Sequence, residues 1–102
     1  MNEKALLSSP HLVCAVDPGK SGAVVRMGQG KFEVRRDFKE LPDIARAVSA
    51  LSSGATHLVM ELVHAMPGQG VCSMFSFGRA SGVADGAFVV ARPNLTVEYV
   101  FL

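Results

Sequence analysis

The chain has 102 residues, of which 49% are apolar and 19% are charged, and its formal net charge is +1. This length and composition provide one buried core, which excludes an intrinsically disordered chain and a two-domain arrangement. The near-neutral charge does not by itself point to an acidic partner, and we expect a single domain over residues 1–102.

The first part of the chain predicts three strands in an antiparallel meander. Residues 1–10 carry mixed charge and are expected to form a flexible tail. The apolar run 11–16 ends in a DPG turn and is typical of a strand that is covered on both faces. Two further strands are predicted over 23–27 and 31–38, and the second alternates apolar and polar residues as a half-exposed strand does.

The rest of the chain predicts two helices and two strands in alternation. A helix over 40–54 has Pro42 in its first turn. The apolar run 56–61 predicts a second buried strand, which the preceding helix places parallel to the first. A helical pattern over 72–91 and a terminal strand over 95–102 complete the order β-β-β-α-β-α-β. We therefore expect an α/β domain, a mixed sheet with helices packed on it.

Three glycines form a stripe along the predicted second helix. Gly78, Gly82 and Gly86 are spaced four apart and so lie on one side of it. Each costs about 1 kcal/mol of helix stability relative to alanine, which suggests a close approach of the helix backbone to the sheet or to a partner helix. Large apolar side chains nearby are expected to pack in a core or a dimer face: Met66, Met74, Phe75 and Phe77.

The cysteines and the longest apolar stretch bear on localisation. Cys14 and Cys72 lie far apart in apolar runs and have no CxxC partner, which predicts buried free thiols in a reducing cytoplasm. The apolar stretch 71–91 is interrupted by Arg79 and Asp85. Each would cost about 2.5–3.5 kcal/mol near the centre of a bilayer, so no membrane insertion is expected.

Two acidic residues each follow a predicted buried strand. In an open α/β sheet, functional groups gather at the carboxyl ends of parallel strands, and Asp17 and Glu61 both occupy such a position. On neighbouring strands they would lie about 4.8 Å apart at the backbone, and two carboxylates that close favour a bridging cation. An oxygen-only pair favours Mg²⁺ or Mn²⁺ over zinc. Each acid could instead end its strand facing water, but their paired placement favours a metal site.

The turn after the first strand also resembles part of a phosphate-binding loop. Gly19, Lys20 and Ser21 match the end of the motif GxxxxGK[ST]. That motif requires a glycine at the position of Cys14 and a helix directly afterwards, whereas residues 23–27 predict a strand. A P-loop is therefore excluded, although a glycine hairpin beside an aspartate remains able to approach a phosphate.

Two sequence blocks, AVDPGKSGAVV and VMELVHAMPGQGVCSMFSFGRASGVADGAF, resemble the RuvC-like Holliday-junction resolvases, especially the phage-type members, within the ribonuclease H-like superfamily. Sugar kinases and actin-like ATPases share an acid-glycine hairpin like the first block, and the second block is more specific. The resemblance implies a homodimeric, Mg²⁺-dependent endonuclease that cuts branched DNA. Asp17 and Glu61 match the first and second catalytic and metal-binding acids of that family, whose metal ions position a water nucleophile.

The resemblance also implies further metal-binding acids on a last helix, beyond the strand that 95–102 represents. The sequence ends at Leu102, so we expect that helix to be missing, the acidic site to be incomplete and the stability to be marginal. Asp85 and Glu98 lie inside a predicted helix and strand and are not expected to replace those acids. The alternative is a non-catalytic DNA-binding or dimerisation module of the same fold.

Polar residues around the acid pair are candidate DNA contacts. They flank the pair or begin the helix after it, where backbone N–H groups receive phosphates; they are Lys20, Gln69, Ser73 and Arg79. Gln69 and Ser73 could instead close the loop and cap the helix. His64 follows Glu61 by three, but this segment leaves a strand for a loop, so we do not expect His64 to be a ligand.

Overall fold

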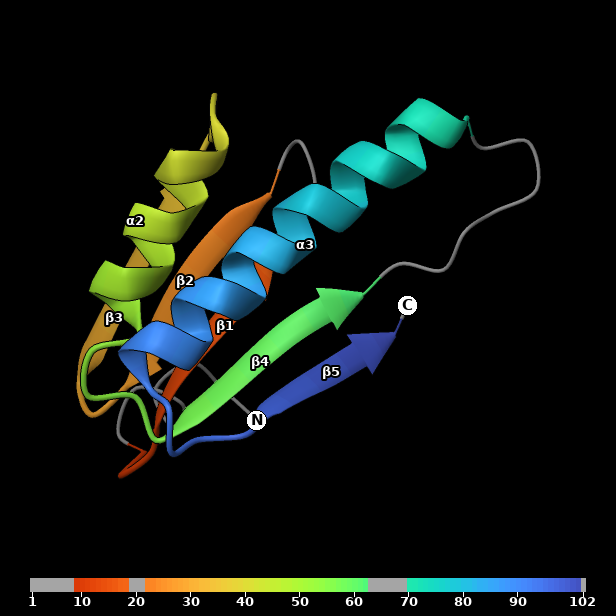
Figure 1. Ribbon diagram of the computed structural model, residues 1–102. Coiled ribbons are helices and arrows are strands. Elements are labelled where there is room, and N and C mark those ends of the chain that lie inside the picture. The colour runs from red at the N-terminus through yellow and green to blue at the C-terminus, as the bar shows by residue number, and fades with distance from the viewer. Residues whose placement is uncertain (1–8, 19–21, 63–69, 102) are drawn as a thin grey trace.

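The computed structural model describes residues 9–18, 22–62 and 70–101, with the side chains of 71–74 and 101 excepted. The order of its elements, β-β-β-α-β-α-β, confirms the order that the sequence predicts (Figure 1). The strands and helices are β1 (Leu12–Asp17), β2 (Ala23–Gly28), β3 (Lys31–Arg36), α2 (Leu41–Leu51), β4 (His57–Leu62), α3 (Val71–Ala91) and β5 (Val97–Phe101).

The strands form one mixed sheet in the order β3-β2-β1-β4-β5. β1 and β2 are antiparallel, as are β2 and β3, which confirms the predicted meander. β4 runs parallel to both β1 and β5. The strand before the DPG turn is thus the central strand of the sheet, with β4 beside it.

Local chemistry explains where α2 begins and ends. Pro42 lies in its first turn, and the Asp43 carboxylate accepts a hydrogen bond from the backbone N–H of Glu40 at 3.1 Å, which satisfies a donor at the helix start. Gly54 follows the helix with a φ of 73°, a conformation that glycine adopts without strain. The apolar face buries the residues that the spacing predicts: Ile44, Ala47, Val48 and Leu51.

One face of the sheet is covered by both helices (Figure 1). We call this the covered face; along β1 it is the side of Cys14 and Val16, which are buried. Phe88 from α3 and Val48 from α2 are fully buried against it. This single layer of contact between helices and sheet is the hydrophobic core.

The other face, which we call the open face, carries no helix within the described ranges. The expectation that β1 is covered on both faces is therefore wrong for the described part of the chain. The reason is topological: the chain moves in the same direction across the sheet from β1 to β4 and from β4 to β5, and two right-handed crossovers in one direction place their helices on the same face.

The turn between β2 and β3 depends on a glycine. Gly28 has a φ of 124°, and a Cβ atom there would lie 1.8 Å from the carbonyl oxygen of His11, so only glycine fits. Next to it, the backbone N–H of Gln29 donates to the carbonyl of Ser9 at 2.8 Å, and its side chain donates to the carbonyl of Pro10 at 3.0 Å. The residues just before β1 are thereby tied to this turn.

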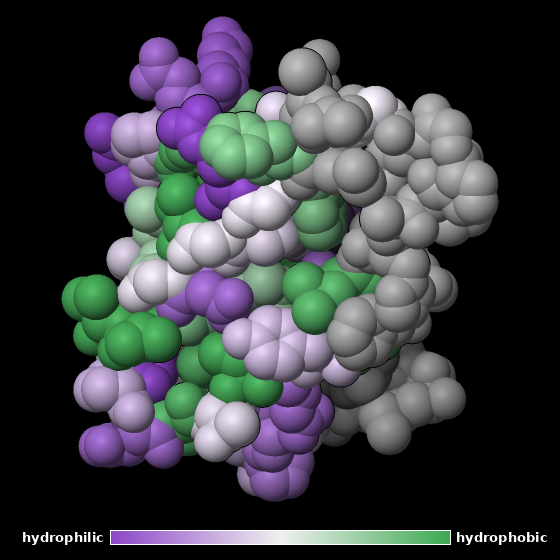
Figure 2. Space-filling view, turned by 45° about the vertical axis from the view of Figure 1, so that its right-hand side comes forward, coloured by the Kyte–Doolittle hydropathy of each residue, from purple (hydrophilic) through white to green (hydrophobic). Residues whose placement is uncertain are grey.

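The glycine stripe of α3 faces away from the sheet. A Cβ atom at Gly78, Gly82 or Gly86 would meet nothing within 4 Å, which excludes the sheet as the surface that these glycines approach. Phe75 is 68% exposed and Val90 is 83% exposed on the same outer side, so a core position for Phe75 is wrong. Apolar groups reach the surface in several places on the face that Figure 2 shows.

Candidate metal site

Asp17 and Glu61 lie at the carboxyl ends of adjacent parallel strands. Asp17 is the last residue of β1, and Glu61 lies next to the end of β4. The two strands are in register with Val16 opposite Met60, so the next residues along are the two acids. The prediction that these acids end neighbouring strands is confirmed.

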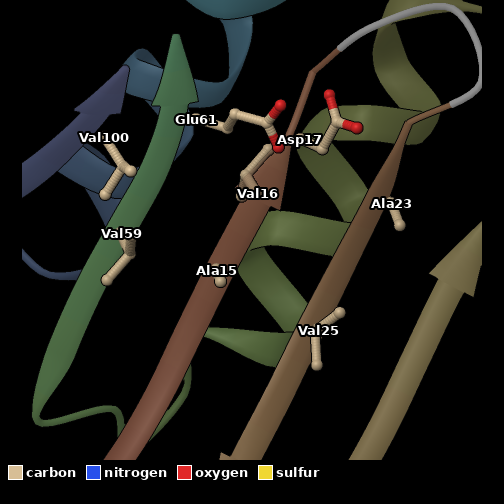
Figure 3. Close-up of a pocket in the computed structure, with 8 residues that line it drawn as sticks. All are labelled: Ala15, Val16, Asp17, Ala23, Val25, Val59, Glu61 and Val100. Atoms are coloured by element: carbon tan, nitrogen blue, oxygen red, sulfur yellow. The ribbon is translucent and has the colours of Figure 1, made fainter. Parts of the chain in front are cut away.

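Both acids belong to the open face. Side chains alternate along a strand, so Asp17 shares the face of Ala15, and Glu61 shares the face of Val59. In Figure 3 the two carboxyl groups lie beside one another at the ends of β1 and β4, with the Glu61 side chain extending toward Asp17. Both acids line a pocket that has a volume of about 320 Å³ and draws on β1, β2, β4 and β5; it is lined by Ala15, Val16, Asp17, Ala23, Val25, Val59, Glu61 and Val100.

The central position of β1 fixes the geometry of the pair. β1 is hydrogen-bonded to β2 along its whole length, with Asp17 opposite Ala23, and β4 is paired on its other side with β5, with Glu61 opposite Val100. Neither acid is on a loop. Side chains held by paired strands keep a more constant separation than side chains on loops, so the two carboxylates form a rigid pair.

The chemistry of this pair fits Mg²⁺ or Mn²⁺. Both donors are carboxylate oxygens, and both residues are half-buried at the rim of an open pocket. Within the residues that the structure describes, no cluster of three or more His, Cys, Asp or Glu side chains occurs. Mg²⁺ in proteins is often held by one or two carboxylates together with waters and substrate phosphates, so the donor set of Asp17 and Glu61 is compatible with such an ion.

Among the four candidate DNA contacts, Arg79 is the one whose side chain the structure describes. Lys20 and Gln69 lie outside the described residues, as does the side chain of Ser73. Arg79 is exposed on α3, which packs on the covered face, so it lies on the other side of the sheet from the carboxylates. His64 also lies outside the described residues.

Asp85 and Glu98, the two acids that are not expected to bind a metal, lie in different surroundings from Asp17 and Glu61. Asp85 accepts a hydrogen bond from the hydroxyl of Tyr99 at 2.6 Å, which links α3 to β5 and raises the pKa of Tyr99. Glu98 is exposed on β5 opposite Val59. It therefore lies on the open face, but at the level of Val59, which comes two residues before Glu61 on β4.

Sequence reasoning missed the apolar part of the pocket. The lining residues Ala15, Val25, Val59 and Val100 share the faces of the two acids on their strands. The alternation of each strand contains this information, because every second residue before an acid lies on the same face. What the sequence lacks is the fact that no described helix covers that face.

Cys14 lies behind the site, on the covered face. Its thiol is fully buried and free, and burial raises its pKa to about 12, while the charge of Arg26 acts in the opposite direction. A thiol with so high a pKa is neither a nucleophile nor a metal ligand at neutral pH. The prediction of a buried free thiol is confirmed for Cys14; the side chain of Cys72 lies outside the described part.

No known protein family and no curated protein matches the sequence. Among solved structures, the chain is similar to Thermus thermophilus RuvC in complex with a Holliday junction substrate, with a TM-score of 0.69 and 15% identity over 89% of this chain and 65% of that one. The fold is RuvC-like. A further Thermus thermophilus RuvC structure matches this RuvC-like fold with a TM-score of 0.59 and 16% identity, over 88% of this chain and 63% of that one. The chain thus spans a little under two thirds of the length of these RuvC chains.

The RuvC likeness confirms the predicted α/β, ribonuclease H-like architecture. Among the helices described, none is long and apolar enough to span a bilayer.

Proposed function

We propose that this chain is a Mg²⁺-dependent, structure-selective DNA endonuclease of the Holliday-junction resolvase type. The observation that supports it is the convergence of Asp17 and Glu61 at the ends of adjacent parallel strands in a RuvC-like fold. The structural neighbour with a TM-score of 0.69 was solved with a Holliday junction, which makes branched DNA the substrate class to test.

In this proposal the chain's own residues hold the cation and fix its place on the sheet. Asp17 and Glu61 would hold the ion with carboxylate oxygens from two paired strands. A bound Mg²⁺ supplies a Lewis acid that activates water and stabilises charge on a phosphate.

We also propose a homodimer, in which the outer side of α3 forms the contact. A four-way junction presents two equivalent strands, and a two-fold dimer presents two equivalent sites to them. The outer side of α3 combines exposed Phe75 and Val90 with glycines that leave room for a close helix–helix approach. Gly82→Leu would fill that room, and we expect it to shift the dimer to monomer in light scattering coupled to size exclusion.

A second candidate function is a module of the same fold that binds branched DNA without cutting it. The described residues provide two converging acids and no larger cluster of metal-binding side chains. A two-acid site holds its metal weakly and depends on other groups for a second ion.

One experiment separates the two candidates. Purified protein is incubated with a labelled four-way junction and Mg²⁺, and both cleavage and binding are measured for the wild type, Asp17→Asn, Glu61→Gln and the matched control Glu98→Gln. We expect the two site variants to lose at least about a hundredfold in cleavage rate, and Glu98→Gln to keep it. Binding without cleavage in the wild type would instead support the module, and cleavage that survives in both site variants would exclude the proposed roles.

A further inference from the structure

Two histidine rings meet where β1 and β4 begin. His57 is the first residue of β4, and His11 directly precedes β1. Their ring centroids lie 4.8 Å apart, with an angle of 84° between the ring planes. Both residues are exposed and lie outside the hydrophobic core, so core packing does not explain why the rings meet. We call them the histidine pair.

The histidine pair is separate from the two acids at the other end of these strands. His57 comes four residues before Glu61 on β4, which is about 13 Å along a strand. The described chain places no third His, Cys, Asp or Glu within reach of an ion held by the two rings. The protein groups that this pair offers to a metal ion are therefore imidazole nitrogens.

The hydrogen bonds of Thr56 fix the proton on the ring of His57. The Oγ1 atom of Thr56 accepts a hydrogen bond from the backbone N–H of Leu12 at 2.9 Å and donates to the carbonyl of Leu12 at 3.2 Å. A hydroxyl has one hydrogen to donate, so at the contact of 2.9 Å with His57 it is Nδ1–H that donates to Oγ1. The neutral ring then keeps the lone pair of Nε2, and a lone pair of this kind is what binds a metal ion.

The spacing of the two rings matches that of two imidazoles on one metal ion. Zn–N bonds of about 2.0–2.1 Å at a tetrahedral ion place the ring centroids of two ligands about 5 Å apart, close to the separation of 4.8 Å in this chain. Imidazole nitrogen suits Zn²⁺, Cu²⁺ and Ni²⁺, whereas carboxylate oxygen suits Mg²⁺ and Mn²⁺. The donor atoms of the histidine pair thus select a different class of ion from those of the acids.

We propose that His11 and His57 bind one Zn²⁺ ion where β1 and β4 begin. The two ring nitrogens hold the ion and water fills its other positions, so binding is weaker than at sites with three or four protein ligands. Thr56 is a positioning residue, because its hydroxyl holds His57 in the tautomer that presents Nε2. The proposal depends neither on the metal site at Glu61 nor on DNA cleavage.

The first test is a Zn²⁺ titration of the full chain without DNA, followed by the NMR resonances of the histidine rings. We expect saturable shifts of the His11 and His57 rings. His11→Gln and His57→Gln should each lower the Zn²⁺ affinity at least about tenfold, because even the loss of a partner of a metal ligand costs about 10–100-fold. His64→Gln removes the third histidine of the chain and should keep the affinity. Rings that do not shift in a large excess of Zn²⁺, or an affinity lost only in His64→Gln, would overturn the proposal.

A comparison of ions separates this site from the proposed Mg²⁺ site. Mg²⁺ should leave the ring resonances of the histidine pair unchanged, and Zn²⁺ should still shift them in Glu61→Gln. Ring shifts that are lost in Glu61→Gln, or that Mg²⁺ produces equally, would overturn the histidine site. Ring shifts with Zn²⁺ in a chain whose acids do not respond to Mg²⁺ would support the histidine site and reject the other one.

Variants of Thr56 test the positioning role. Thr56→Val removes the hydroxyl and should lower the Zn²⁺ affinity about tenfold, whereas Thr56→Ser keeps the hydroxyl and should keep the affinity; circular dichroism checks that both variants fold. Equal affinities in the two variants would remove Thr56 from the proposal. Zn²⁺ should also raise the Tm of the wild type, because it binds two residues that folding brings together. A Tm that Zn²⁺ leaves unchanged would overturn the site.

Discussion

The covered face of the sheet buries Phe88 completely, whereas the open face leaves a pocket beside Asp17 and Glu61. Both faces are built from the same strands, with alternate residues facing opposite ways. On the covered face two helices exclude water, and that is where burial stabilises the fold. On the open face the same strands present carboxylates to solvent, where a cation and a substrate are able to reach them. The buried core and the proposed metal site thus lie on opposite sides of one sheet.

The largest expected difference between the faces concerns side-chain truncation. Phe88→Ala should lower the free energy of unfolding by about 3–5 kcal/mol, because it leaves a cavity in the core. Val59→Ala, on the open face, should lower it by only about 1 kcal/mol, because that side chain is half-buried. Urea unfolding of both variants measures the contrast, and equal losses would show that the open face is as well packed as the covered one.

The thiol of Cys14 predicts a pH dependence that arises from the covered face. Its pKa is raised from 9.0 to about 12 in the folded chain, so the folded state keeps its proton where the unfolded state loses it. This contribution to stability is complete below pH 9 and is lost as the pH rises from 9 towards 12. At pH 10 the loss is about 1.4 kcal/mol. Urea unfolding at pH 8 and pH 10 should show this loss in the wild type but not in Cys14→Ala.

A methyl group added on the outer side of α3 should raise the stability of the chain, whereas a truncated core side chain lowers it. Gly82→Ala adds a methyl group that meets nothing within 4 Å, so we expect it to raise the stability of the monomer by about 1 kcal/mol through helix propensity alone. Gly28→Ala, the matched control in the turn, should destabilise the fold, because its methyl group would collide with the carbonyl of His11. Thermal melting at low protein concentration distinguishes the effects of these two variants. A destabilised Gly82→Ala would mean that the outer side of α3 already packs against another surface.

The smallest expected effect concerns the link between α3 and the edge strand β5. Tyr99→Phe removes the hydrogen bond to Asp85, and because both side chains are exposed to solvent we expect a loss of about 0.5 kcal/mol. A double-mutant cycle with Asp85→Asn isolates the pairwise part. A coupling energy near zero would show that this bond does not hold the edge strand to the covered face.

The sequence predicts the elements well where one periodicity dominates. The spacing of Ile44, Ala47, Val48 and Leu51 identifies the buried face of α2, and the apolar run before Asp17 identifies the central strand. Placing Asp17 beside Glu61 required only the rule that a helical crossover joins parallel strands. These features follow from local sequence patterns and one topological rule, so a single sequence is enough to predict them.

The remaining features depend on which surfaces meet, and the sequence pattern does not specify that. An apolar run predicts burial but does not say that both helices cover the same face, so the pocket over Ala15 could not be foreseen. The sequence does not fix the orientation of α3, so its glycines are compatible with a contact to the sheet or to a partner helix. Phe75 resembles a core residue for the same reason. DNA contacts by Lys20, Gln69 and Ser73 stay predictions, because those side chains lie outside the described residues.

We propose that Asp17 and Glu61 share one divalent cation on the open face. The most direct measurement is a Mg²⁺ titration followed by amide NMR shifts in the wild type, Asp17→Asn, Glu61→Gln and Glu98→Gln. We predict saturable shifts that are confined to the ends of β1 and β4, that are lost in either site variant and that are kept in Glu98→Gln. Identical titration curves in all four proteins would contradict it.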